Sequence, residues 1–284
     1  MKIKFDCLPC IFRQTIEASQ MAAENEEVIR EIINEYAKMI PDISFEDTGP
    51  EVVTRVQNII KDKTGKIDPY HDFKNKNIKK ALSHYPDIEQ NIEKSDQPLL
   101  NALIMSAMGN AIDAGVSLKV DMKSSIDKAA EFGFIKSDFK KFKNILEDSQ
   151  NVLIIADNAG EAVFDRLLIK ELNKYNVEIT YAVREKPILN DVTLREAKGL
   201  GIDESCNLIS SGCKAPGLIL EKSSNTFKKY YKNADLRISK GQGNLEGLSE
   251  VKEDIFFLLK AKCELVADLL GVEVGDLVFI LNII

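Results

Sequence analysis

The stretch Val152-Leu-Ile-Ile-Ala-Asp-Asn-Ala-Gly-Glu161 joins an apolar run to a polar turn. The apolar run is short and contains β-branched residues, which predicts a buried strand. Asp157 and Asn158 end this strand, and a turn at Gly160 leads into a predicted helix over residues 161–174. Because ligands bind at the carboxyl ends of strands in open α/β sheets, the polar residues of this turn are the first candidates for a functional site.

Residues beyond about 150 alternate between predicted strands and helical stretches. This alternation predicts an α/β fold with a mainly parallel sheet and helices on both faces. The final apolar run, residues 277–284, is too short to cross a membrane and predicts one more buried strand. The other strands are expected at 152–156, 177–183, 206–210, 236–239 and 254–259.

The first half of the chain has apolar residues at helical spacing. Pro50 stands where a third helix would begin and Gly65 stands just past its end, which is the usual placement of these residues around a helix. The polar, lysine-rich stretch 66–96 predicts solvated helices with a break near Pro86. This half is therefore expected to be helical.

A nearly continuous apolar stretch, residues 99–116, predicts the central buried helix of this half. Asn110 and Asp113 interrupt it, and their spacing of three places them on one face. They could be a satisfied polar pair in the core, or they could point at the sheet edge. The spacing of apolar residues changes from helical to alternating strands and helices at about residue 150, which puts the domain boundary between residues 135 and 150. We expect a mostly helical domain over 1–145 and an α/β domain over 146–284.

The composition limits the classes of function. The chain has 284 residues, 44% of them hydrophobic, and a net charge of -7, which argues against a nucleic-acid binder dominated by phosphate contacts. Five cysteines, an odd number, favour a reducing compartment over a disulfide framework. The start of the chain lacks a signal-peptide core, and no apolar run is long enough to span a membrane. We expect a cytoplasmic protein that acts on a small molecule.

Polar and charged residues follow four of the predicted strands. Since the carboxyl ends of parallel strands meet at one sheet edge, these residues are expected to converge. Carboxylate and amide oxygens suit a hard cation, whereas lysines and a helix N-terminus suit an anion. The combination suits a metal-bound phosphate ester. The four sets are Asp157-Asn158; Arg184 to Thr193 with Asn190 and Asp191; Lys240-Gly241-Gln242-Gly243-Asn244; and Lys260 to Cys263 with Lys262.

Each of these motifs has a simpler interpretation when it is taken alone. An Asp or Asn after a strand is more often a turn or N-cap residue. Gly241, Gly243 and Gly247 follow a strand as in a dinucleotide-binding loop, but the last spacing is one residue too long for the common form. The two Asp/Asn pairs together with the glycine loop favour the metal and phosphate site over both alternatives.

Cys7-Leu-Pro-Cys10 is half of a zinc site, which would need two further ligands. The spacings of the other cysteines match no zinc ribbon. Two buried thiols that pack the first helix are the alternative. The two histidines fall in the polar helical region, so histidine-based catalysis has no evident residue.

At these motifs the sequence resembles the damage-control phosphatases, a metal-dependent ARMT-like family, along most of the chain. The resemblance rests on the order and spacing of several motifs that are each weak alone. The N-terminal Cys-x-x-Cys pair resembles that of the branch found in archaea and some bacteria. Leu259-Lys-Ala-Lys262 stands where another branch has Arg-Thr-x-Lys, so that branch's sugar-phosphate preference is not carried over. The motifs are Cys7-Leu-Pro-Cys10 with Arg13-Gln14, Gly109-Asn-Ala-Ile-Asp113, Asp157-Asn-Ala-Gly-Glu161, Asn190-Asp-Val-Thr193, Lys240-Gly-Gln-Gly-Asn244 and Lys260-Ala-Lys-Cys263.

The resemblance implies a helical N-terminal domain packed on a Rossmann-like three-layer α/β domain, and a phosphatase that hydrolyses small phosphometabolites such as sugar phosphates or phosphopantetheine-like compounds. It implies that Asp157, Asn158 and Asp191 hold Mn²⁺, Mg²⁺, Co²⁺ or Ni²⁺, and that Lys240 contacts phosphate. Asp157, Asp191 and Lys240 are the expected catalytic residues. The expected substrate and phosphate contacts are Asn158, Gly160, Glu161, Arg184, Asn190, Lys240, Gly241, Asn244, Lys262, Asn110 and Asp113, and Cys7 and Cys10 are a possible second metal site.

Two mechanisms and two other functions stay open at this point. Water activated by the metal could attack phosphorus, or Asp157 could attack it directly. We favour water because the Asp-x-Asp pattern of the haloacid-dehalogenase phosphatases is absent. A methyltransferase using S-adenosylmethionine is one alternative function, although no glycine-rich loop follows the first strand. A non-enzymatic metal or thiol sensor that works through Cys7 and Cys10 is the other.

Overall fold

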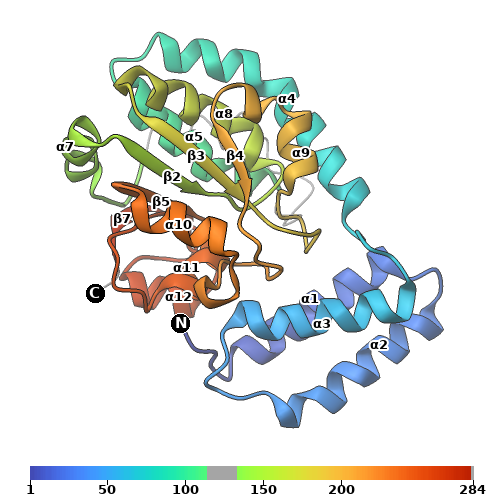
Figure 1. Ribbon diagram of the computed structural model, residues 1–284. Coiled ribbons are helices and arrows are strands. Elements are labelled where there is room, and N and C mark those ends of the chain that lie inside the picture. The colour runs from blue at the N-terminus through green and yellow to red at the C-terminus, as the bar shows by residue number, and fades with distance from the viewer. Residues whose placement is uncertain (114–132, 283–284) are drawn as a thin grey trace.

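The structure is a computed structural model of the chain and describes residues 1–113 and 133–282, with the side chains of 110–113 outside the description. Figure 1 shows two groups of elements, a small bundle of helices at the N-terminus and a sheet covered by helices. None of the helices in the described ranges is long and apolar enough to cross a membrane. The helices of the first half are α1 (Cys7–Ala22), α2 (Glu26–Met39), α3 (Gly49–Thr64), α4 (His71–Glu93) and α5 (Pro98–Asp113).

Helices α1 to α3 share a small core of their own, in which Ile32, Tyr36 and Ile60 are fully enclosed. Local signals fix the ends of α3. Thr48 and Glu51 form a capping box at its start, and Gly65 ends it in the left-handed conformation with φ of 67°. The proline and glycine boundaries expected for this helix are therefore confirmed.

Helix α4 runs without interruption through Pro86, so the expected break there is wrong. Its buried face, which includes Ala81, Ile88 and Ile92, belongs to the core beneath the sheet. Packing of this face compensates for the backbone hydrogen bond that a proline removes. Helices α4 and α5 thus share their core with the sheet, although they lie before residue 145. The division of the chain at residue 145 stays a prediction.

Within the described residues, a seven-stranded sheet forms the centre of the molecule, in the order β1-β7-β6-β5-β2-β3-β4. All of its neighbouring pairs are parallel except β6 and β7. The predicted strands are present with ends shifted by at most two residues, except that the last ends at Leu281, three residues before the expected end, and β1 was not expected. The strands are β1 (Lys136–Ser137), β2 (Asn151–Ile155), β3 (Glu178–Val183), β4 (Asn207–Ser210), β5 (Leu236–Lys240), β6 (Phe256–Lys260) and β7 (Leu277–Leu281).

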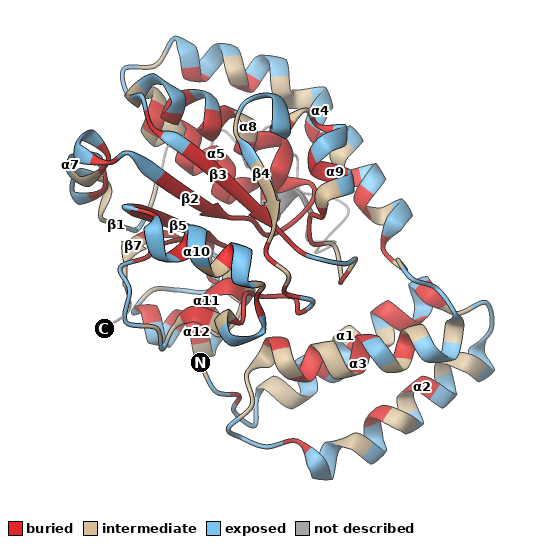
Figure 2. Ribbon diagram, viewed as in Figure 1, coloured by how far each residue is buried: buried red, intermediate tan, exposed pale blue. Residues whose placement is uncertain are grey.

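Helices cover both faces of this sheet, which makes a three-layer α/β arrangement. Figure 2 shows buried residues concentrated along the strands and on the sheet-facing sides of the helices. Continuous apolar runs such as β2 are typical of parallel strands that are buried on both faces. The helices of this half are α7 (Phe139–Asp148), α8 (Glu161–Leu172), α9 (Leu194–Gly199), α10 (Asn225–Asn233), α11 (Gln242–Leu248) and α12 (Glu264–Leu270).

Strand β2 lies at the point where the order of the sheet reverses. From β2 the chain passes to β3 and β4 on one side, and it then returns to β5 and β6 on the other side. In open α/β sheets the crevice at such a point, beyond the carboxyl ends of the strands, is the usual place for a ligand. The residues after β2, β3 and β5 therefore stand at the most favourable position in this fold.

Candidate active site

The turn after β2 and the loop after β3 bring Asp157, Asn158 and Asp191 together. The backbone N–H of Val192 donates to the carbonyl of Asp157 at 2.8 Å, and Asn158 and Asp191 form an isolated antiparallel bridge. All three predicted metal-site residues are buried, with 3 to 6% of their surface exposed. The backbone therefore fixes the two carboxylates and the amide relative to one another.

Arg184, the first residue after β3, lies between these two carboxylates. Its Nε donates to Asp191 Oδ2 at 2.6 Å, and its Nη2 is 3.6 Å from Asp157 Oδ1. Arg184 is 1% exposed. Its Nη1 has no hydrogen-bond partner in the described part of the chain, although it is buried. A buried guanidinium N–H without a partner can donate to a bound anion, and this is favourable because an unpaired buried donor is costly.

Burial and, after it, the nearby Asp191 carboxylate raise the pKa of Asp157 to about 6, against the opposing effects of Lys262, Arg184 and Lys240. Burial also raises the pKa of Asp191, against the effect of Arg184. The surrounding cations thus leave the negative charge of the pair only partly compensated. An added cation would complete that compensation.

Lys240, at the end of β5, is fully buried and paired with two carboxylates on α8. Its Nζ is 2.8 Å from Glu161 Oε2 and 2.5 Å from Asp165 Oδ1. Ser106 on α5 and Tyr181 on β3 each donate to Asp165 at 2.6 Å. Four elements therefore hold the lysine in place. Its ionic partners within the described residues are these two carboxylates.

Glu161 connects this lysine to the predicted metal residues. Asn158 Nδ2 donates to Glu161 Oε1 at 2.8 Å and to Asp157 Oδ2 at 3.2 Å. Burial raises the pKa of Glu161 to about 7, although Lys240 opposes this effect. Gly109 on α5 permits the approach, because a Cβ there would lie 2.7 Å from the Cα of Glu161.

The sequence patterns did not identify Asp165, Ser106 and Tyr181 as neighbours of the predicted site residues. One signal for Asp165 was present in the sequence, because it stands four residues after Glu161 and thus on the same helical face. The two acids lie on a helix whose other buried residues are mainly apolar. The hydroxyls of Ser106 and Tyr181 gave no comparable signal, since nothing local distinguishes them from other core residues.

Asn244 and Gly241, from the glycine loop, shape the site from the side of β5. Asn244 Oδ1 accepts from Arg184 Nη2 at 2.8 Å and from the Leu218 backbone N–H at 2.7 Å. Its Nδ2 donates to the carbonyls of Lys240 and Ala156 at 2.7 and 3.0 Å. These four bonds use the full capacity of the amide, so Asn244 orients Arg184.

Gly241 has φ of 78°, and a Cβ there would lie 1.9 Å from Asp157 Oδ2. Glycine at this position is therefore required for the Asp157 carboxylate to occupy its place. The neighbouring helix α11 begins at the next residue. The role of the glycine in this loop is thus to let the backbone lie close to the Asp157 carboxylate.

The remaining predicted residues are placed as follows. Lys262 is exposed on the loop after β6, and its charge lowers the pKa of both Asp157 and Asp191. The Asn190 carbonyl accepts from Ala159 N–H at 2.9 Å. Gly160 is the N-cap of α8. The side chains of Asn110 and Asp113 lie outside the described residues.

All five cysteines are free thiols, and Cys7 and Cys10 lie in the first turn of α1. Partial burial raises the pKa of both thiols. Over residues 1–109 and 133–282, no three His, Cys, Asp or Glu side chains are grouped as ligands of a metal ion. The predicted second metal site at these two cysteines stays a prediction.

The donor set at the sheet edge fits a hard divalent cation. Asp157, Asn158 and Asp191 supply two carboxylates and one amide, which are oxygen ligands of the kind that Mg²⁺ and Mn²⁺ prefer. Burial raises the pKa of both carboxylates, so the buried pair is favourable to a cation. The unpaired Nη1 of Arg184 beside them fits an anion.

The chain is similar to known proteins over nearly its whole length. The damage-control phosphatase ARMT1-like domain matches residues 3–278. A damage-control phosphatase of Pyrococcus horikoshii is 32% identical over 99% of both chains, and one of Archaeoglobus fulgidus is 30% identical over 98% of both. An uncharacterised protein of Methanocaldococcus jannaschii is 36% identical over 97% of this chain and 94% of its own.

The fold has a solved counterpart. The crystal structure of a DUF89 family protein from Pyrococcus horikoshii superimposes with a TM-score of 0.91 at 30% identity, and the match covers 99% of each chain. The expected α/β fold with a helical N-terminal part is thereby confirmed. The match over nearly the whole chain shows that this protein belongs to the damage-control phosphatase ARMT1-like family and is a phosphatase.

Proposed function

We propose that the protein hydrolyses phosphomonoesters of small metabolites with a divalent cation held by Asp157, Asn158 and Asp191. Mn²⁺, Mg²⁺, Co²⁺ and Ni²⁺ are the candidate ions. The observation that carries the proposal is the buried pair of carboxylates beside Arg184, whose Nη1 is buried and unpaired among the described residues. This arrangement supplies oxygen ligands for a cation and a donor for a phosphate at one place.

Hydrolysis requires an oxygen of water to form a bond to phosphorus while the ester P–O bond breaks and the leaving alcohol takes up a proton. The cation, when bound, polarises the phosphoryl oxygens and lowers the pKa of water. Arg184 Nη1 and the Lys262 ammonium donate to the phosphoryl oxygens and offset their charge. Such positioning and electrostatic stabilisation account for most of the catalysis of phosphoryl transfer.

The other residues of the site position these groups. Asn244 fixes the guanidinium of Arg184, and Glu161 fixes the amide of Asn158. Lys240 holds Glu161 in place and adds a buried positive charge close to the carboxylates.

The test is phosphate release from a panel of phosphometabolites. The chelated protein is assayed first, and Mn²⁺, Mg²⁺, Co²⁺ or Ni²⁺ is then restored. We expect release only with metal. Asp157→Asn and Asp191→Asn should each lower kcat/KM by at least about a hundredfold, since each removes a charged ligand next to the reacting group.

Asp203→Asn is the matched control, because Asp203 is an exposed carboxylate on the short helix Ile202–Glu204 and takes no part in the hydrogen bonds or ion pairs described for the site. This variant should keep the wild-type rate. Undiminished metal-dependent release by Asp157→Asn would overturn the assignment of the site. Release that persists in the chelated protein would overturn the metal requirement alone.

A further inference from the structure

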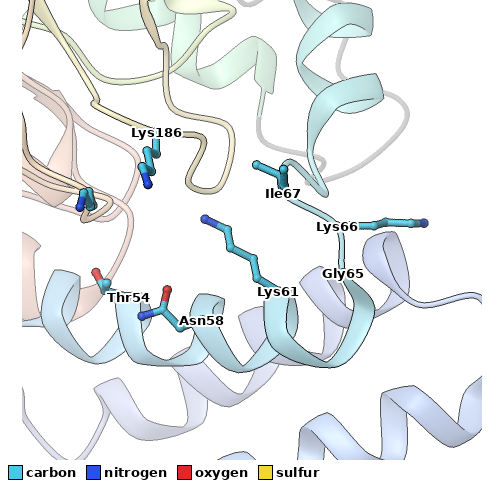
Figure 3. A pocket seen from close by; sticks show the side chains of 8 residues that line it. Thr54, Asn58, Lys61, Gly65, Lys66, Ile67 and Lys186 are labelled. Atoms are coloured by element: carbon cyan, nitrogen blue, oxygen red, sulfur yellow. The ribbon is translucent and has the colours of Figure 1, made fainter.

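A cavity whose lining includes neither Asp157 nor Asp191 lies between helix α3 and the loops that follow β3 and β4. Its volume is about 420 Å³. Lys61 lines it from α3, Lys186 from the loop after β3, and Lys214 from the loop after β4. Figure 3 shows the Lys61 and Lys186 side chains extending toward each other across the cavity, while Lys66 points away from them.

The cavity concentrates the positive charge of the lysines that line it. Over the residues that the structure describes, neither Lys61, Lys186 nor Lys214 forms an ion pair. Lys61 is half-buried and donates to the Pro187 carbonyl at 2.8 Å. Burial lowers the pKa of Lys61, Asp68 opposes this, and Lys186 lowers it further. Like charges gathered in a cavity whose lining includes no carboxylate are a favourable place for an anion.

The remaining lining adds groups that can bind the same ligand. Thr54 and Asn58 lie one turn apart on α3 and bring a hydroxyl and an amide to the cavity, as Figure 3 shows. The Asn58 amide can donate to an anion, whereas the Thr54 hydroxyl already donates to the Pro50 carbonyl at 2.6 Å and can accept from a sugar hydroxyl. The apolar contribution comes mainly from Ile67.

The same loop serves this cavity and the carboxylate site. Lys186 is two residues from Arg184, so their Cα atoms are at most about 7 Å apart. The loop then continues to Asp191, and on the way the Pro187 carbonyl is bound by Lys61 while Leu189 packs against the core of α1 to α3. The cavity and the carboxylate site therefore share one short loop.

We propose that this cavity binds a second anionic group of the substrate, so that the enzyme favours phosphometabolites with another phosphate or a carboxylate several bonds from the scissile phosphate. The inference rests on the proposed function, since it takes the carboxylate site as the place of the scissile phosphate. Lys186 and Lys214 are the specificity-determining residues, and Lys61 also holds the loop in place.

Three ligands with the same anomeric phosphate test this inference. Glucose 1-phosphate carries a neutral group at C6, glucuronate 1-phosphate carries a carboxylate there, and glucose 1,6-bisphosphate carries a phosphate. Their binding to the full-length chelated protein is measured by calorimetry, where no turnover is expected. Their kcat and KM are measured separately with the activating metal present.

The wild-type protein should bind at least one of the two doubly anionic ligands about tenfold or more tightly than glucose 1-phosphate, as expected for two charge-assisted contacts. The double variant Lys186→Ala, Lys214→Ala should lose this preference through a rise in Kd and KM, while kcat and the affinity for glucose 1-phosphate change less than about twofold. Lys252→Ala, an exposed lysine outside the cavity, is the matched control and should behave as the wild type.

The binding pattern also identifies the second anion. A preference for both doubly anionic ligands supports a general anion site, and a preference for the bisphosphate alone supports a phosphate site. Equal binding of all three ligands by the wild type, including no measurable binding, overturns the inference. A preference that survives in the double variant overturns it as well. A lysine-dependent preference without hydrolysis of any ligand would instead count against the proposed function.

Discussion

At the scale of single residues, Gly241 shows how closely the backbone approaches the candidate site. Its φ of 78° and the 1.9 Å distance from a would-be Cβ to Asp157 Oδ2 leave no room for a side chain. Gly241→Ala should lower kcat/KM by at least tenfold and destabilise the fold by about 1 to 3 kcal/mol, since both the backbone and the carboxylate must move.

Gly199→Ala provides the control for this substitution. Gly199 is the last residue of α9, and a Cβ there would meet no atom within 4 Å. Phosphate release and urea denaturation should be close to wild type for Gly199→Ala. Wild-type activity of Gly241→Ala would mean that Asp157 does not need its present position.

At the scale of elements, a buried ionic cluster links α4 to α9. Lys74 Nζ is 2.9 Å from Glu196 Oε1 and 2.9 Å from Asp68 Oδ2. Burial alone would raise the pKa of Glu196, but hydrogen bonds from Thr193, Lys74 and Arg195 outweigh it and bring the pKa to about 2. The folded chain thus favours the ionised form of this acid.

This shift gives a pH dependence with a definite sign. Because the pKa of Glu196 is lower in the folded chain than the usual 4.5, its stabilisation is present above pH 4.5 and is lost as the pH falls toward 2. Glu196→Gln should reduce the free energy of unfolding by about 2 kcal/mol at pH 7. Urea denaturation from pH 7 to pH 3 should show the difference from wild type narrowing below about pH 4.5. Glu204→Gln, at an exposed position, should show no such trend.

At the scale of the whole molecule, cation binding should stabilise the fold. An ion that binds only the folded chain adds about 2.7 kcal/mol at a hundred times its Kd. The melting temperature of the chelated protein should therefore rise when Mn²⁺ is added, and the rise should be absent in Asp157→Asn. An equal rise in Asp157→Asn would place the bound ion elsewhere, for example at Cys7 and Cys10.

The local sequence determined most of the α/β framework. Each strand of the parallel sheet is recognisable as a short apolar run, and the turn that follows it carries polar residues, such as Asp157 and Asn158 after β2. The rule that strand ends meet at one edge then brought Arg184, Asp191 and Lys240 to the same region. These inferences need only neighbouring residues and the direction of the chain.

Only the tertiary structure decided which of these side chains pair. Lys240 binds Asp165 and Glu161, Arg184 lies between two carboxylates, and α4 joins the core of the sheet despite its place in the first half. The lysine cavity joins residues 61, 186 and 214, which no local pattern connects. Charge pairing and burial depend on distances through space between elements far apart in the chain, whereas periodicity reports only on which face of its own element a residue lies.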